Sequence, residues 1–103
     1  LQPDQTTCGG ISEGRRIAWT ANDHGILVVF HGWNTAVGVA ADLQTSAALS
    51  QARWVEFLTP TAYIDDILVD PFKLDKEGYL PIPDKPGLGI EIDVSAVKRF
   101  AAQ

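Results

Sequence analysis

The sequence predicts an α/β protein built on a parallel sheet, either doubly wound or barrel-like. Two observations carry this prediction. Over the first sixty residues, short apolar runs alternate with longer segments whose apolar residues recur at helical spacing. One of the short runs, Ile26–Phe30, is apolar throughout and rich in β-branched residues, which is typical of a strand buried on both faces. The order strand, helix, strand, helix, strand is the βαβ pattern.

The first unit begins with Leu1–Pro3, which we expect to be the end of a strand that stops at Asp4. A polar, glycine-rich turn follows. Helical spacing of apolar residues then predicts a helix over Ile11–His24, with Ser12 or Thr7 helping to start it. Ile26–Phe30 is the second predicted strand.

The second unit repeats this plan. Thr35–Ser50 is rich in alanine and leucine and predicts a helix of small residues packed closely on the sheet. Trp54–Leu58 is the third predicted strand, ended by Thr59-Pro60. We therefore divide the chain into residues 1–60, the βαβ part, and residues 61–103, an extension of different character.

The extension contains shorter elements. Tyr63–Val69 fits one helical turn or an extended stretch, and Asp75–Gly78 has the composition of a hairpin turn. In the segment after this turn, Pro81, Pro83 and Pro86 exclude a central strand. Ile90–Ile92 is a short predicted strand, and Asp93 is positioned to cap a last helix over Val94–Ala102.

Composition limits the possible functions. The chain has 103 residues, of which 46% are hydrophobic and 20% charged, which suits one globular domain. A net charge of −5 without a basic cluster disfavours nucleic-acid binding, and no apolar run is long enough to span a membrane. The single cysteine, Cys8, excludes an internal disulfide and fits a reducing compartment such as the cytoplasm.

Three polar residues stand where the predicted strands end: Asp4, His31 and Glu56. Because sites in parallel α/β sheets are built at the carboxyl ends of strands, these side chains are candidates for one site. An aspartate beside a histidine makes a competent acid or base near neutral pH. The alternatives are a structural histidine and an aspartate that only caps a turn. Anion binding at Gly9-Gly10 is a weaker alternative.

Several motifs together resemble a known family. They are Gln2-Pro3-Asp4, Cys8-Gly9-Gly10-Ile11, His31 after an apolar strand, Glu56-Phe57, and Pro83-Asp84-Lys85-Pro86-Gly87-Leu88-Gly89-Ile90. In this order they resemble the C-terminal part of a mandelate racemase/muconate lactonizing enzyme-like member of the enolase superfamily. The stretch His31–Thr35 with Ala40–Gln44 is similar to members that process acid sugars.

The resemblance implies a fold and a chemistry. The fold would be the C-terminal portion of a TIM-like (β/α) barrel, with residues 61–103 returning to a capping domain. The reaction would be abstraction of the proton α to a carboxylate of a small molecule such as an acid sugar, with Mg²⁺ as cofactor. By resemblance, His31 is the acid or base, Asp4 its orienting partner and Glu56 an acid that bonds a substrate carboxylate oxygen. Trp33 lines the substrate pocket or anchors its loop.

The same resemblance implies that other parts are needed. The family's metal-binding carboxylates come from earlier strands, so no metal ligand is expected in this chain. Asp65, Asp66 and Asp70 are expected to be solvated surface. The absence of methionine and the opening Leu1-Gln2 favour a segment of a longer enzyme, inactive alone and associated with the remaining chain or with other copies. The alternative is a non-catalytic interaction module that binds through open sheet edges.

Overall fold

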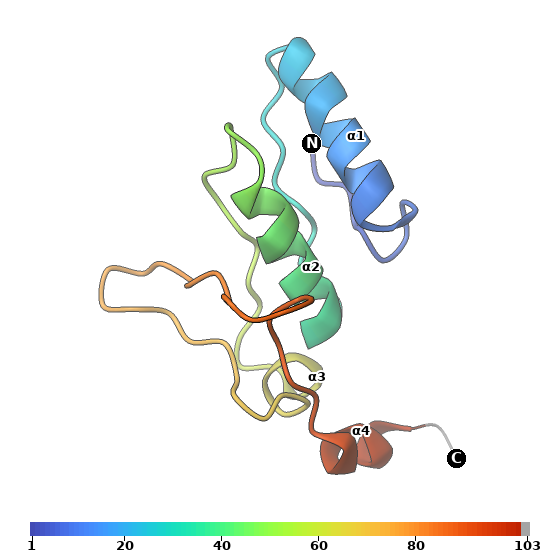
Figure 1. The fold of residues 1–103 in the computed structure, drawn as a ribbon, viewed down its shortest axis with the longest axis vertical. Coiled ribbons are helices and arrows are strands. Elements are labelled where there is room, and N and C mark those ends of the chain that lie inside the picture. The colour runs from blue at the N-terminus through green and yellow to red at the C-terminus, as the bar shows by residue number, and fades with distance from the viewer. Residues whose placement is uncertain (102–103) are drawn as a thin grey trace.

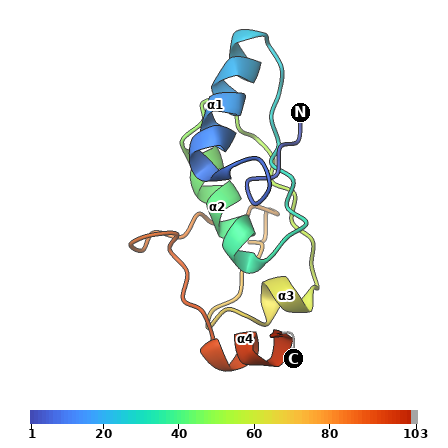
Figure 2. The same ribbon diagram turned by 90° about the vertical axis from the view of Figure 1, so that its right-hand side faces the viewer.

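Four helices form the framework of the protein. The computed structural model describes residues 1–101, and its helices follow the order α1 (Gly10–Asp23), α2 (Ala36–Ala47), α3 (Ala62–Asp65) and α4 (Val94–Phe100). α2 packs against α1 on one side and against α3 on the other. α1 and α4 lie at opposite ends of the molecule in both side views (Figures 1 and 2).

The helix predictions are largely confirmed. The segment expected as Ile11–His24 forms α1 one residue earlier, and α2 is a shorter version of the segment expected as Thr35–Ser50. The predicted start of α1 is wrong, because the cap residue is Gly9 in a left-handed conformation, with no side-chain bond from Ser12 or Thr7.

The elements of the extension are also mostly as expected. The stretch Tyr63–Val69 contributes one helical turn, α3, which begins at Ala62. Asp93 caps α4, because its carboxylate accepts hydrogen bonds from the N–H groups of Ser95 and Ala96. The predicted last residue of this helix, Ala102, lies outside the described residues.

The predicted strands are wrong as strands: Leu1–Pro3, Ile26–Phe30 and Trp54–Leu58 are non-helical segments, and residues 1–101 contain no β-strand. The first two segments still lie side by side. The amino terminus of Leu1 donates to Leu27 O at 2.8 Å, Val29 N–H donates to Leu1 O at 3.0 Å, and His31 N–H donates to Pro3 O at 3.0 Å. Pro3 has no N–H that could donate a hydrogen bond to the Ile26–Phe30 segment. The backbone pairing between the two segments is therefore too short for a β-ladder.

The third segment is not paired with the second. Trp54–Leu58 makes no backbone–backbone hydrogen bond within the described part of the chain. The N–H of Gly32, which a neighbouring strand would use, donates instead to the side chain of Glu56 at 2.8 Å. Ile90–Ile92 is likewise no strand and contributes a single antiparallel bridge, between Ile92 and Leu68.

The predicted turn at Asp75–Gly78 is confirmed. Asp75 N–H donates to Tyr79 O at 2.8 Å, and its carboxylate accepts from the N–H groups of Glu77 and Tyr79. The chain on either side of the turn is extended without strand pairing and projects away from the helices (Figure 1).

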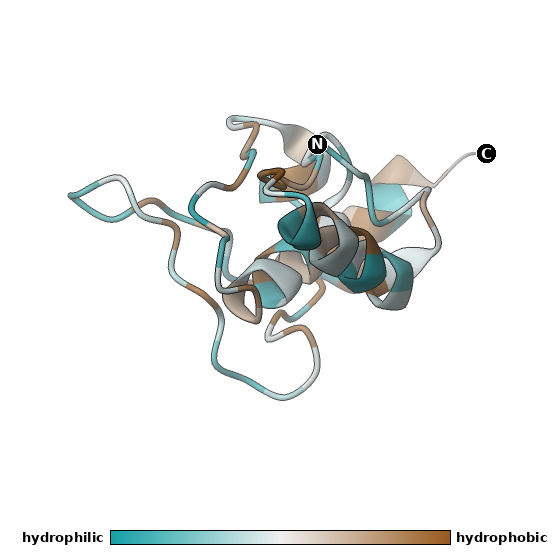
Figure 3. Cartoon of the chain, turned by 90° about the horizontal axis from the view of Figure 1, so that it is seen from above, coloured by the Kyte–Doolittle hydropathy of each residue, from teal (hydrophilic) through white to brown (hydrophobic). Residues whose placement is uncertain are grey.

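Two apolar clusters hold the elements together. The first joins α2 to the residues around α3: Ala36, Val39, Leu43, Ile64, Ile67 and Leu68. The second joins α1 to the Ile26–Phe30 segment and Leu49: Ala18, Ala21, Val28, Phe30 and Leu49. Figure 3 shows apolar residues on the connecting segments as well as on the helices.

Burial of the Ile26–Phe30 segment differs from the prediction. Val28 and Phe30 are buried, whereas Ile26 is 47% exposed and Leu27 43% exposed. α1 and Leu49 cover one side of the segment, and the expectation of burial on both faces is therefore wrong for this chain. No helix within residues 1–101 combines the length and apolar character needed to cross a membrane.

Candidate active site

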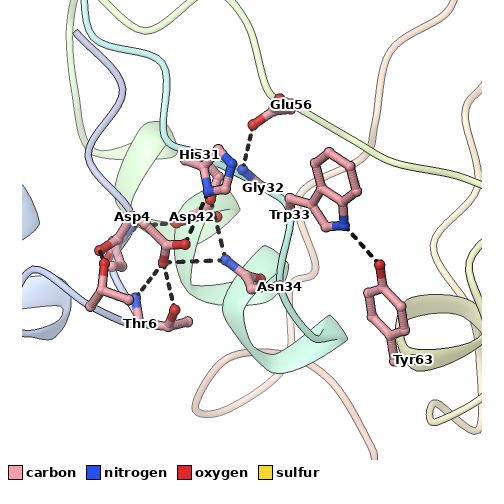
Figure 4. Close-up of polar contacts among 11 residues, drawn as sticks. Asp4, Thr6, His31, Gly32, Trp33, Asn34, Asp42, Glu56 and Tyr63 are labelled. Carbon is pink, nitrogen blue, oxygen red and sulfur yellow. Dashed lines mark hydrogen bonds and ion pairs between the residues drawn. The ribbon is translucent and has the colours of Figure 1, made fainter.

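Asp4 and His31 meet directly. Asp4 follows the short Leu1–Pro3 segment and His31 follows Ile26–Phe30, and the backbone bonds between these segments bring their ends together. The His31 ring nitrogen Nδ1 lies 3.0 Å from Asp4 Oδ2 (Figure 4). The pairing expected from two adjacent strand ends therefore exists even though no strands are formed.

Asp4 performs two tasks at once. Its Oδ1 accepts hydrogen bonds from the N–H of Thr6 at 2.8 Å and from the hydroxyl of Thr6 at 2.6 Å, while Oδ2 bonds His31. Burial raises the pKa of Asp4, but the hydrogen bonds from Thr6 and His31 together outweigh this effect and leave the pKa below its ordinary value. Asp4 thus makes the contacts that turn capping requires and also the contact to His31; its orienting role stays a prediction.

The hydrogen bond to Asp4 raises the pKa of His31; partial burial opposes this, and the charges of Glu56 and Asp4 add to it. The His31 side chain is 39% exposed. With Nδ1 held by a carboxylate, Nε2 carries the lone pair of the neutral ring and is the nitrogen available for chemistry.

Glu56 is held near His31 by a hydrogen bond from the backbone N–H of Gly32. Its Oε2 accepts the Gly32 N–H at 2.8 Å, and its charge acts on His31 without a direct contact. Gly32 is needed for this approach, because a Cβ at that position would lie 2.0 Å from the Glu56 carbonyl oxygen. The third predicted residue therefore lies beside the pair and is half-buried.

Trp33 is anchored and exposed. Its Nε1–H donates to the hydroxyl of Tyr63 at 2.9 Å, and the tryptophan is still 63% exposed (Figure 4). The two roles considered for Trp33, loop anchor and pocket lining, are compatible in this geometry. Tyr63 was not recognisable as a neighbour from the sequence, because its position depends on how α3 packs against α2.

A second layer of polar residues lies behind the pair. Asn34 Nδ2 points to Asp4 Oδ1 at 3.5 Å and donates to His31 O at 3.2 Å. Gln5 and Asp42 are buried, and Gln5 Nε2 donates to Asp42 Oδ1 at 3.0 Å. The sequence signal for this layer was an aspartate in the middle of a small-residue apolar helix, which is costly to bury unless it is paired.

Residues 1–101 contain no group of three or more histidine, cysteine or acidic side chains arranged to hold a metal ion. Asp65 lies in the first turn of α3, where its carboxylate accepts from the Thr61 N–H at 2.6 Å and the Thr59 hydroxyl at 3.2 Å. Asp66 and Asp70 are exposed. The described residues therefore do not fit a resident Mg²⁺.

A groove of about 600 Å³ lies elsewhere on the molecule. It runs between the C-terminal end of α2, the residues around Val55 and Phe57, and the turn near Tyr79. Asp4, His31 and Glu56 are not among the residues that line it. The groove is therefore separate from the acid–base residues.

The candidate site thus consists of a histidine–aspartate pair with a neighbouring glutamate, each following or lying within one of three successive non-helical segments. Comparison with known proteins identifies the family. The family model described as "Enolase C-terminal domain-like" matches residues 1–97. The chain belongs to the enolase superfamily, in its mandelate racemase/muconate lactonizing enzyme group, as the sequence motifs predicted.

The similar proteins are enzymes of this superfamily. A D-galactarolactone cycloisomerase from Agrobacterium fabrum is 38% identical over 109 residues, covering 97% of this chain and 29% of the relative. A D-xylonate dehydratase from Haloferax volcanii is 33% identical over 98 residues, covering 95% and 24%. An enolase-superfamily crystal structure from Polaromonas matches with a TM-score of 0.84 at 34% identity, covering 99% and 27%.

These figures also describe the extent of the chain. It spans between about a quarter and a third of the length of the two relatives it matches. The fold of the superfamily's C-terminal domain is supported by the structural matches, including a TM-score of 0.86 to a Sulfitobacter enzyme at 25% identity that covers 96% of this chain and 24% of that one.

Proposed function

We propose that this chain is the C-terminal catalytic segment of a Mg²⁺-dependent enzyme that abstracts the proton α to a carboxylate. The substrate is a small carboxylate such as an acid sugar, and the reaction is a dehydration, a racemisation or epimerisation, or a cycloisomerisation. The observation that carries the proposal is the 3.0 Å bond between Asp4 and Nδ1 of His31, which leaves Nε2 for proton transfer. Relatives named as a cycloisomerase and a dehydratase are consistent with this chemistry.

His31 is the group that moves the proton. In the neutral ring, Nε2 takes the α-proton, and the imidazolium that forms is stabilised by the Asp4 carboxylate on the other nitrogen. The raised pKa of His31 has the same origin, because the hydrogen bond to Asp4 favours the charged ring. Run in the opposite direction, the imidazolium returns a proton to carbon and serves as the acid.

Glu56 is assigned to the substrate carboxylate. It lies beside His31, fixed by the Gly32 N–H, and in its protonated form the Glu56 carboxyl donates a hydrogen bond to a substrate carboxylate oxygen, which strengthens as negative charge builds up during proton removal. Trp33, held by Tyr63 and exposed, is assigned to the wall of the substrate site.

Mg²⁺ would stabilise negative charge on the substrate. Because residues 1–101 offer no ligand set, we assign the metal to other parts of the complete enzyme. The chain alone is accordingly proposed to be inactive. We also propose that residues 1–60 belong to a partial (β/α) barrel and residues 61–103 to an extension toward a capping domain. The uncovered side of Ile26–Phe30 supports an additional layer that covers it.

The test is the exchange of the substrate α-proton in the complete enzyme that contains this chain. His31→Asn keeps a polar side chain but removes the base, and we expect exchange with D₂O to fall by at least about 10²-fold. Proton NMR of candidate acid sugars, including D-galactarolactone and D-xylonate, follows the loss of the α-proton signal. His24→Asn is the matched control, since His24 lies exposed at the end of α1.

Exchange at the wild-type rate in His31→Asn would contradict the proposal. The alternative, a non-catalytic module, predicts a different result in a mixing experiment. If the chain binds the remaining enzyme segment stably but the complex shows no Mg²⁺-dependent turnover, the module is the better description.

A further inference from the structure

A buried carboxylate lies behind the acid–base pair. Asp42, on α2, is 1% exposed, and its Oδ1 accepts from Gln5 Nε2 at 3.0 Å. Its second oxygen, Oδ2, is buried and has no hydrogen-bond partner in the described residues. An ionised carboxylate with one oxygen buried and unpaired is costly, and the side chain therefore needs a further contact.

A second buried oxygen has the same problem. Oδ1 of Asn34 is also buried and unpaired in the part of the chain that the structure describes. Its amide lies against α2 at Gly38, where a Cβ would sit 2.1 Å from this oxygen, and Asp42 follows Gly38 one helical turn later. The Asn34 amide lies close enough to Asp42 to influence its pKa.

One proton on Asp42 would satisfy both oxygens. Two acceptors cannot bond each other, but a protonated carboxyl is a donor, and Asn34 Oδ1 is an acceptor. With this oxygen occupied, the amide presents Nδ2 to Asp4 Oδ1 and to His31 O, as observed (Figure 4). The reverse orientation would direct the amide oxygen at the Asp4 carboxylate and would repel it.

We propose that Asp42 is a positioning residue: its neutral carboxyl donates to Asn34 and thereby fixes the amide that supports Asp4 and His31. This inference rests on the proposed function of the pair. Asp42 does not touch substrate, and it acts through Asn34. The proton on Asp42 therefore sets the orientation of Asn34, and that orientation determines whether Asp4 receives the amide hydrogen bond.

The electrostatics of the pocket are consistent with a neutral carboxyl. Burial raises the pKa of Asp42 to about 7, against the hydrogen bond from Gln5 and the nearby Asn34 amide, which lower it. Two titratable groups act on it by charge: Asp4 raises its pKa and His31 lowers it. Loss of the proton in alkaline solution lets the amide turn and donate to Asp42 instead of Asp4.

Two variants in the complete enzyme separate this role from simple packing. Asp42→Asn keeps a donor for Asn34 at every pH, whereas Asp42→Leu has similar size and no polar atom. We expect the NMR titration of the His31 ring to show two steps in the wild type, one of its own and one from Asp42. In Asp42→Asn the second step is absent, and this readout does not require turnover.

Kinetics supply the second readout. Asp42→Leu should lower kcat for proton exchange about 10-fold or more with KM little changed, and Asp42→Asn should recover most of this loss. A His31 titration in Asp42→Asn that keeps both steps would overturn the proposal, even if Asp42→Leu does not fold. Coupled titration without any α-proton exchange would support Asp42 as a positioning residue and contradict the proposed function instead.

Discussion

Three carboxylates of residues 1–60 and three of the extension bond to different kinds of partner. In the first region, Asp4 bonds His31, Asp42 bonds Gln5, and Glu56 bonds Gly32, each across at least 24 residues of sequence. In the extension, Asp65, Asp75 and Asp93 accept hydrogen bonds from residues within six positions.

This difference distinguishes the carboxylates of the candidate site from carboxylates that stabilise a local turn or helix end. A carboxylate that closes its own turn uses its lone pairs on nearby N–H groups and stabilises one short element. A carboxylate that joins remote segments requires the tertiary fold, and Asp4 in this way holds His31, the proposed acid–base group. Asp4 belongs to both kinds, because it caps the turn at Thr6 and also bonds His31.

The largest effect is expected where the remote segments are packed together. Phe30 is 2% exposed and lies between α1 and Leu49, directly before His31. Phe30→Ala should lower the free energy of unfolding by about 3–5 kcal/mol, because it removes a large buried side chain and leaves a cavity. Urea unfolding followed by tryptophan fluorescence measures this change.

Leu74→Ala is the control for Phe30→Ala. Leu74 is 51% exposed near the turn of the extension, and its loss should change stability by no more than about 0.5 kcal/mol. Equal losses in the two variants would show that the site-bearing region does not depend on the second apolar cluster.

A smaller effect on stability but a clear effect on chemistry is expected from Asp4→Asn. The hydrogen bond to Asp4 raises the pKa of His31, so the variant should lower that pKa. Because the folded-state pKa of His31 is raised, the stabilisation from this pair is complete below the ordinary histidine pKa of about 6.5 and is lost as pH rises through the folded value.

NMR titration of the His31 ring protons measures the shift, with the His24 signal as an internal reference. An unchanged His31 titration curve in Asp4→Asn would show that the 3.0 Å contact does not control the base. The stability difference between the two proteins should also shrink as the pH is raised.

Much of the site could be predicted from the sequence because its residues follow short apolar runs. The ends of Leu1–Pro3 and Ile26–Phe30 meet, and they bring Asp4 to His31, as the βαβ pattern predicts. The strands themselves could not be predicted correctly, since strand formation needs partners on each side. Pro3 cannot donate, and the Glu56 side chain occupies the N–H of Gly32.

The contacts within the second layer of polar residues could not be predicted from the sequence pattern. The roles of Gln5, Asn34 and Asp42 depend on how α2 packs beneath the turn after Asp4, which periodicity does not specify. The same holds for Tyr63, which reaches Trp33 only through the packing of α3. Local capping needs no such information, and the prediction for Asp93 was therefore correct.

The smallest effect is expected at Asp93. Its pKa is lowered, chiefly by the hydrogen bond from the Ala96 N–H, with a further bond from Ser95. The stabilisation it gives to α4 is therefore present above the ordinary aspartate pKa and is lost as pH falls through the lower folded value. Asp93→Ala should slightly reduce stability at neutral pH and should match the wild type in strong acid.

Circular dichroism and urea unfolding at several pH values measure this effect, with Asp84→Ala, at an exposed position in the same region, as control. The titration of His31 should be the same in Asp93→Ala as in the wild type, because the Asp93 carboxylate accepts hydrogen bonds from N–H groups of its own helix. A shifted His31 titration in Asp93→Ala would mean that the extension is coupled to the acid–base pair, and the distinction between local and remote carboxylates would then fail.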